Sequence, residues 1–120
     1  MLRTILLFIT LFAVSGVFAS NFNFIHKSAP ISDFNKEDMA MFETAIQASL
    51  NEKKDGEKLA WKNEKTGVSG LVNPLSTYID DKSECRDVRI VNKSKKNIAE
   101  SKFRFCKKDG TWLVTEMLNK

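Results

Sequence analysis

The chain has 120 residues, of which 42% are hydrophobic and 28% charged, and its net charge is +4. This length allows one small domain and little else. The positive excess is too small to indicate a nucleic-acid-binding protein, although it favours residence near anionic lipid or polysaccharide.

The first 19 residues have the pattern of a cleaved secretory signal peptide. Arg3 supplies a positive charge, residues 5–14 are almost wholly apolar, and Ser15-Gly16 breaks this run before Val17-Phe18-Ala19. Small and medium residues at this point are what signal peptidase requires. The alternative is a retained membrane anchor, but a spanning helix needs about 20 apolar residues and this run is shorter. We expect export to the periplasm, outer membrane or cell surface, with no transmembrane span after cleavage.

Residues 20–34 are expected to form a tether that leads into a single domain at residues 35–120. Phe22 and Phe24 alternate with asparagines, which also fits a short edge strand, but Pro30 soon ends any ladder. His26 is the sole histidine and has no nearby cysteine or histidine that could complete a metal site. We therefore expect no metal and no other cofactor.

An amphipathic helix is predicted at residues 36–53. Asn35 is a favoured N-cap residue, and acidic residues follow it in the first turn. Apolar residues then recur at three- and four-residue steps. They are Met39, Phe42, Ile46 and Leu50, with Ala45 beside them. Gly56 is available to end the helix. Such a stripe is typical of a helix that packs on its own domain, although a partner-binding helix has the same pattern.

After residue 56 the spacing changes from helical to alternating, which predicts strands. Leu59 and Trp61 lie on one side of a short strand that is followed by a turn at residues 63–67. Residues 68–73 form a second strand, which Pro74 is expected to stop. Gly70 within it indicates a bulge or a close contact with a bulky neighbour such as Trp61. Residues 75–82 are expected to form a connecting loop.

Residues 85–91 and 99–106 are predicted to form the best-defined hairpin, with a cysteine at the outer end of each strand. If Cys85 faces Cys106, then Val88 lies opposite Phe103, and the two sulfurs are placed to form a disulfide in an exported chain. The alternative is a catalytic or metal-binding pair of thiols. These cysteines, however, have no Cys-x-x-Cys partner and no histidine near them.

The same register sorts the hairpin side chains, because alternate residues of a strand point to opposite faces. One face carries Val88, Ile90, Phe103 and Phe105, and the other carries the cysteines with Asp87, Arg89, Lys102 and Arg104. Four basic residues form a candidate contact face: Arg86, Arg89, Lys102 and Arg104. They offer positive charge to an envelope protein or an anionic envelope component. An ordinary solvated face is the alternative, since charge on a strand commonly serves solubility.

A second hairpin corner, Asp109-Gly110, agrees with this register. The pair suits a two-residue type I′ turn, in which both central residues have positive φ. Such a turn pairs Phe105 with Val114 and adds Trp112 to the apolar face. We therefore predict an α+β fold, with one amphipathic helix on a small antiparallel sheet of four to five strands clamped by a disulfide.

The elements Trp-x-Asn, Thr-Gly, Gly, Pro, Cys-Arg, Cys and Asp-Gly-x-Trp follow one another over about half of the chain. Their order resembles the C-terminal domain of the seventeen-kilodalton outer-membrane surface antigens. The matching residues include Trp61, Asn63, Gly67, Gly70, Pro74, Asp109, Gly110 and Trp112. The chain departs from the family in its Lys107, in the lack of a cysteine at the cleavage site and in the lack of a glycine zipper. The resemblance implies the fold and an envelope location, but neither lipid anchoring nor catalytic residues.

Three functions are weighed against these observations. We expect a non-enzymatic envelope protein that acts through contacts. The alternative is an exported inhibitor or effector with a cystatin-like helix-on-sheet plan, in which residues 72–75 serve as an inserted loop, although fold analogy is a weak guide to function. An enzyme has the least support, because a hydrolase needs a positioned base and His26 lies in the expected tether.

Overall fold

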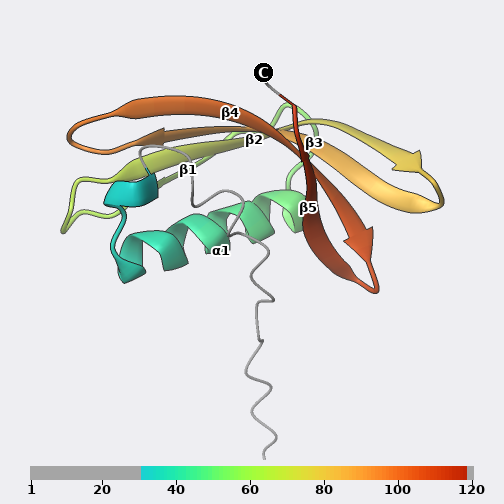
Figure 1. Ribbon diagram of the computed structural model, residues 1–120, viewed down its shortest axis with the longest axis horizontal. Helices are drawn as coiled ribbons and strands as arrows, with labels where there is room; N and C mark the ends of the chain where they lie inside the picture. The colour runs from blue at the N-terminus through green and yellow to red at the C-terminus, as the bar shows by residue number, and fades with distance from the viewer. Residues whose placement is uncertain (1–30, 119–120) are drawn as a thin grey trace, which may run out of the picture.

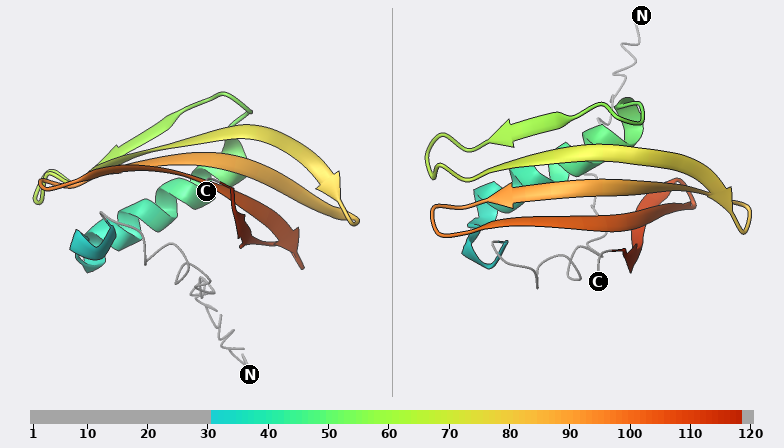
Figure 2. Two further views of the ribbon diagram at one scale, coloured as in Figure 1. Left: turned by 45° about the horizontal axis from the view of Figure 1, so that its top comes forward. Right: turned by 90° about the horizontal axis from the view of Figure 1, so that it is seen from above.

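The computed structural model describes residues 31–118, which form one helix on one face of a five-stranded antiparallel sheet (Figure 1). A short 3-10 turn, η2 (Ile31–Asp33), precedes helix α1 (Lys36–Glu52). The strands are β1 (Leu59–Lys62), β2 (Ser69–Asp80), β3 (Ser83–Lys93), β4 (Ile98–Lys108) and β5 (Thr111–Met117). Each strand pairs with the next in the chain, so β1 and β5 are the edges. The helix crosses beneath the sheet, and the opposite face is open (Figure 2).

The predicted leader and the residues Phe22, Phe24 and His26 lie outside the described part of the chain. The core begins before the predicted domain boundary at residue 35. Ile31 is 4% exposed, and Phe34 packs edge-on against Phe42 and Trp61 with ring centroids 6.0 and 5.7 Å apart. The last residues of the expected tether therefore belong to the domain, because their apolar side chains extend the core past the start of α1.

Helix α1 begins as predicted and ends differently. Asn35 Oδ1 accepts a hydrogen bond from the Asp38 backbone N–H, and Asp38 Oδ2 accepts one from the Asn35 N–H, which completes a capping box. The apolar stripe faces the sheet, and Phe42 at its centre is fully buried. The helix ends at Glu52, and its C-cap residue, Lys53, has an extended backbone. Gly56 therefore does not cap the helix.

The register of β3 on β4 is the predicted one. Cys85 pairs with Cys106 and forms a disulfide with it, and Val88 pairs with Phe103. The side chains assigned to the apolar face lie buried between the sheet and the helix: Val88, Ile90, Phe103, Phe105 and Trp112. Asp109 and Gly110 both have positive φ, at 50° and 77°, as a type I′ turn requires. The α+β prediction is confirmed.

Strand β2 is longer than predicted because it continues through Pro74. The ladder with β1 ends at Val72, so the missing N–H of Pro74 removes no bond between strands. The Pro74 carbonyl instead accepts a hydrogen bond from the Gly56 N–H at 2.7 Å, and the register with β3 shifts between Pro74 and Ser76. The expected loop at 75–82 is therefore mostly strand, and it ends in a two-residue turn at Asp81-Lys82 where both φ angles are positive.

Gly70 is required by the close approach of Trp61, its partner across the β1–β2 ladder. A Cβ at position 70 would lie 2.3 Å from Trp61 Nε1 and 3.0 Å from Asn92 Oδ1. No side chain fits there unless the indole moves, which agrees with the close contact expected from the sequence.

We predict that Gly70→Ala lowers the free energy of unfolding by about 2 kcal/mol, because a packed indole must shift to admit the methyl group. Urea unfolding monitored by circular dichroism measures this loss. The control is Ser69→Ala, on the other face of β2, which should change stability by less than about 0.5 kcal/mol. Equal unfolding midpoints for Gly70→Ala and the unmodified protein would contradict the steric explanation.

Candidate functional site

The open face of the sheet carries three of the four basic residues proposed as a contact face, but it is not a basic surface. Arg89 Nε donates a hydrogen bond to Glu100 in an ion pair across the β3–β4 ladder. The hydrogen bond from Arg89 lowers the pKa of Glu100. Lys102 is exposed on the same face. These residues form part of an exposed network of alternating charge.

Arg104 is compensated by two carboxylates. Its Nε donates to Asp87 Oδ1 at 3.0 Å, and its Nη1 donates to Glu116 Oε2 at 3.0 Å. The Tyr78 hydroxyl donates to the same Asp87 oxygen at 2.7 Å, and its ring lies 5.4 Å from the guanidinium carbon. Burial and the bond to Asp87 raise the pKa of Tyr78, so the phenol stays protonated. This cluster binds β2 to β4 and β5 rather than presenting free positive charge.

Arg86, the fourth predicted contact residue, lies on the opposite face. Its place in β3 directs the side chain under the sheet, where it is 5% exposed. Its Nη1 donates to the carbonyls of Ser49 and Leu50 at 3.2 and 2.8 Å, and its Nη2 donates to the Lys53 carbonyl and to Asp55 Oδ1 at 2.8 and 2.9 Å. Carbonyls at a helix C-terminus lack partners within the helix. Arg86 therefore caps α1 from the sheet, and its assignment to the contact face is wrong.

Asp38 anchors the other end of the helix. Its carboxylate is 1% exposed, and Oδ1 accepts hydrogen bonds from Asn63 Nδ2 at 2.8 Å and Thr66 Oγ1 at 2.7 Å. Both donors belong to the turn between β1 and β2. Helix α1 is therefore attached to the sheet at each end by a buried charged side chain, with Asp38 at its N-terminus and Arg86 at its C-terminus.

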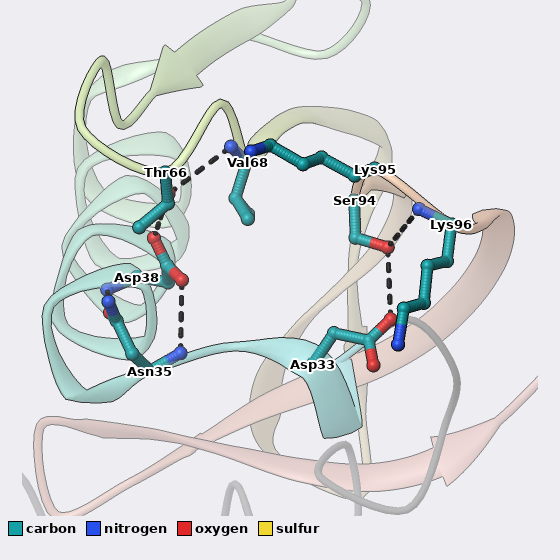
Figure 3. Close-up of a pocket in the computed structure, with 8 residues that line it drawn as sticks. All are labelled: Asp33, Asn35, Asp38, Thr66, Val68, Ser94, Lys95 and Lys96. Carbon is teal, nitrogen blue, oxygen red and sulfur yellow. Dashed lines mark hydrogen bonds between the residues drawn. The ribbon is translucent and has the colours of Figure 1, made fainter.

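A polar cavity of about 380 Å³ lies beside the Asp38 network, where the helix N-terminus meets the β1–β2 and β3–β4 turns (Figure 3). Ser94 Oγ donates to Asp33 Oδ2 at 3.0 Å and accepts from the backbone N–H of Lys96 at 3.3 Å. Thr66 Oγ1 on the opposite wall is already bonded to Asp38 and to the Val68 N–H. The polar groups of this cavity thus hold three segments together.

An apolar groove of about 450 Å³ runs between α1 and the edge strand β1. Small side chains at four-residue spacing leave this space along the helix: Ala40, Thr44 and Ala48. Leu59 and Trp61 form the strand side. We did not predict this groove, although the three small residues flank the apolar stripe in the sequence and were its available signal.

The outer edge of β1 borders this groove and is unpaired among residues 31–118. The Asn63 N–H donates to the Val68 carbonyl on the β2 side at 2.8 Å. Because alternate residues of an antiparallel strand bond to the same neighbour, Trp61 also faces β2, while Ala60 and Lys62 direct their N–H and C=O groups outward. An unsatisfied strand edge and an apolar groove therefore lie together.

Comparisons of the chain with models of protein families, with curated proteins and with solved structures found no match. Within the described residues, no helix has the length and apolar character needed to cross a lipid bilayer. In the same part of the chain, no three His, Cys, Asp or Glu side chains are grouped so that they could hold a metal ion.

We predict that Arg86→Lys destabilises the domain by about 3 kcal/mol, nearly as much as Arg86→Ala. A lysine ammonium is a point donor and cannot span the carbonyls that the guanidinium reaches, so buried acceptors lose their partners. The control is Arg89→Ala, which removes an exposed ion pair and should destabilise the domain far less than either Arg86 variant. Chemical unfolding of the three variants makes the comparison, and full stability of Arg86→Lys would contradict the capping role.

Asp55 should make the stability depend on pH through its bond to Arg86. Hydrogen bonds from Arg86 and then Thr77 lower the pKa of Asp55, so its ionised form favours the folded state. This stabilisation is present above the pKa of about 3.9 that the unfolded chain has, and is lost as pH falls through the lower folded pKa. The stability difference between the unmodified protein and Asp55→Asn should therefore shrink from pH 6 to pH 2. A difference that stays constant over that range contradicts the assignment.

Proposed function

We propose that this chain is an exported, non-enzymatic envelope protein that binds an extended segment of another polypeptide between α1 and β1. The observation that carries this proposal is the position of the unpaired β1 edge beside the apolar groove. Neither feature alone would be sufficient, since many sheets have free edges and many helices have shallow grooves.

Strand addition uses both features at once. An extended peptide that joins a sheet edge gains backbone hydrogen bonds, while its alternate side chains enter pockets beside the edge. Here the outward N–H and C=O groups of Ala60 and Lys62 would pair with the incoming strand. Its inward side chains would then pack on Ala40, Thr44 and Ala48. A partner with small or medium apolar residues at alternate positions fits this arrangement.

The proposed envelope location rests on the predicted leader, on the resemblance to the surface antigens and on the disulfide. A Cys85–Cys106 bridge is stable in an oxidising compartment. Several residues that carry the resemblance have structural roles in this fold: Trp61 packs over Gly70, Asn63 binds Asp38, and Arg86 caps the helix. The resemblance therefore supports the fold and the location, while the groove supports the contact function.

The inhibitor alternative has lost the loop on which it depended. Val72, Asn73 and Pro74 are buried within β2, so they do not form an inserted loop. The proposal that the protein is not an enzyme is supported by the side chains of residues 31–118 whose pKa is shifted. Asp55, Tyr78 and Arg104 are such side chains, and each is held in an ion pair or hydrogen bond that joins structural elements.

Photo-cross-linking in living cells tests the groove directly. A benzophenone amino acid at Thr44 should cross-link to a partner, whereas the same group at Lys102 on the open face should not capture that partner. We expect Ala60→Pro to abolish the Thr44 cross-link because proline removes an outward N–H that strand addition uses. Ala48→Arg should abolish it by filling the groove.

The matched control is Ala60→Arg, which keeps the backbone N–H and points its side chain away from the groove. Its Thr44 cross-link should persist. Circular dichroism and the thermal midpoint establish that each variant is folded. A Thr44 cross-link that survives Ala60→Pro would contradict binding by strand addition, as would the absence of any cross-link at Thr44.

A further inference from the structure

We propose that one end of the sheet docks onto an anionic lipid surface. This end is the turn between β3 and β4, and we call its residues Lys93, Lys95, Lys96 and Ile98 the basic tip. Figure 1 shows this turn at the left, on the same side as the turn between β1 and β2. The basic tip shares no residue with the groove, so this inference goes beyond the proposed peptide-binding function.

The basic tip concentrates a positive charge that is otherwise spread thinly over the protein. Residues 93–98 contain three lysines and no acidic residue, and all three lysines are exposed. Among residues 31–118, none of these lysines has a carboxylate partner in an ion pair. Their ammonium groups are therefore available to an external anion.

The acidic residues near the tip do not cancel this charge. Glu37 pairs with Lys65 at 3.5 Å and Glu64 pairs with Lys62 at 3.8 Å, so each of these carboxylates has its own lysine. Two nearby acidic residues have no lysine partner within residues 31–118, Asp33 and the buried Asp38. The tip lysines together with Lys36 outnumber these two. The N-terminus of α1 adds the positive end of its dipole.

The opposite end of the sheet lacks this excess. Its two turns, residues 80–83 and 107–110, contain three lysines and three aspartates and are therefore electrically balanced. An anionic surface would attract one end of the molecule and not the other. The strands would then stand at an angle to the surface with the basic tip against it.

An exposed isoleucine distinguishes a membrane from a soluble anion as the partner. Ile98 is 69% exposed and directly follows the lysine-rich turn. Interfacial binding combines apolar side chains at the boundary of the acyl chains with basic side chains among anionic headgroups. Ile79 is equally exposed, at 70%, but it precedes Asp80-Asp81 at the balanced end. The two isoleucines therefore differ in their charged neighbours.

Vesicle co-sedimentation tests the proposal with the protein purified as the cell exports it. Vesicles of phosphatidylcholine with about 30% phosphatidylglycerol, an anionic lipid, should bind it more tightly than vesicles of pure phosphatidylcholine. The combined change Lys93→Gln, Lys95→Gln and Lys96→Gln should weaken binding about 100-fold, because each lysine near such a surface contributes roughly fivefold. Ile98→Ser should weaken binding about tenfold.

Matched variants at the other positions control for net charge and for exposed apolar area. The combined change Lys58→Gln, Lys82→Gln and Lys108→Gln removes the same charge, and Ile79→Ser removes the same side chain. Both should bind vesicles as the unmodified protein does. The proposal is overturned if the two triple variants lose affinity equally, if neutral vesicles bind as tightly as anionic ones, or if millimolar inorganic phosphate releases the protein at constant ionic strength. None of these outcomes alters the Thr44 cross-linking test.

Discussion

Two buried charges of opposite sign fix the helix on the sheet, and the rest of the structure depends on them. Asp38 near the helix N-terminus accepts bonds from the β1–β2 turn, and Arg86 of β3 donates bonds to carbonyls at the C-terminus. Each charge has the sign that the nearby end of the helix dipole favours. Burying a charge is costly unless it is compensated. Arg86 is paired with Asp55 and hydrogen-bonded to carbonyls, and Asp38 accepts hydrogen bonds from Asn63, Thr66 and the Asn35 N–H. Removing either one would leave polar groups buried without partners.

The attached helix contacts β1 through Phe42 and Trp61, whose ring centroids are 6.2 Å apart, and the apolar groove lies beside this contact. The helix is held at its ends by bonds to the β1–β2 turn and to β3, while its middle presents Ala40, Thr44 and Ala48 to the edge strand. These small side chains leave the space of the groove open. The groove follows from the small residues that α1 presents to β1, and the free strand edge follows from the strand order. The proposed binding site needs no residue beyond those that the fold already places there.

Much of the fold could be predicted because independent local constraints agreed. The Cys85–Cys106 pairing, the alternation of apolar residues and the Asp109-Gly110 turn all require one register. The same alternation places Arg86 beneath the sheet, but we grouped it with basic residues of the open face by charge alone. The strand through Pro74 was missed because the end of the β1 ladder is not visible in the sequence. The groove was not predicted, since its small residues flank the apolar stripe in the sequence but their position opposite β1 appears only in the folded chain.

The central functional claim is that the β1 edge is free to accept a strand from a partner. Amide hydrogen exchange of β1, measured residue by residue by NMR, tests this claim most directly. In the free protein, the amide of Trp61 faces β2 and should exchange slowly, while those of Ala60 and Lys62 face outward and should exchange at rates near those of an unstructured chain. This alternation is the signature of a strand edge held open beside the helix. Equal protection of all three amides would mean that the edge is already covered, and the proposed site would not exist.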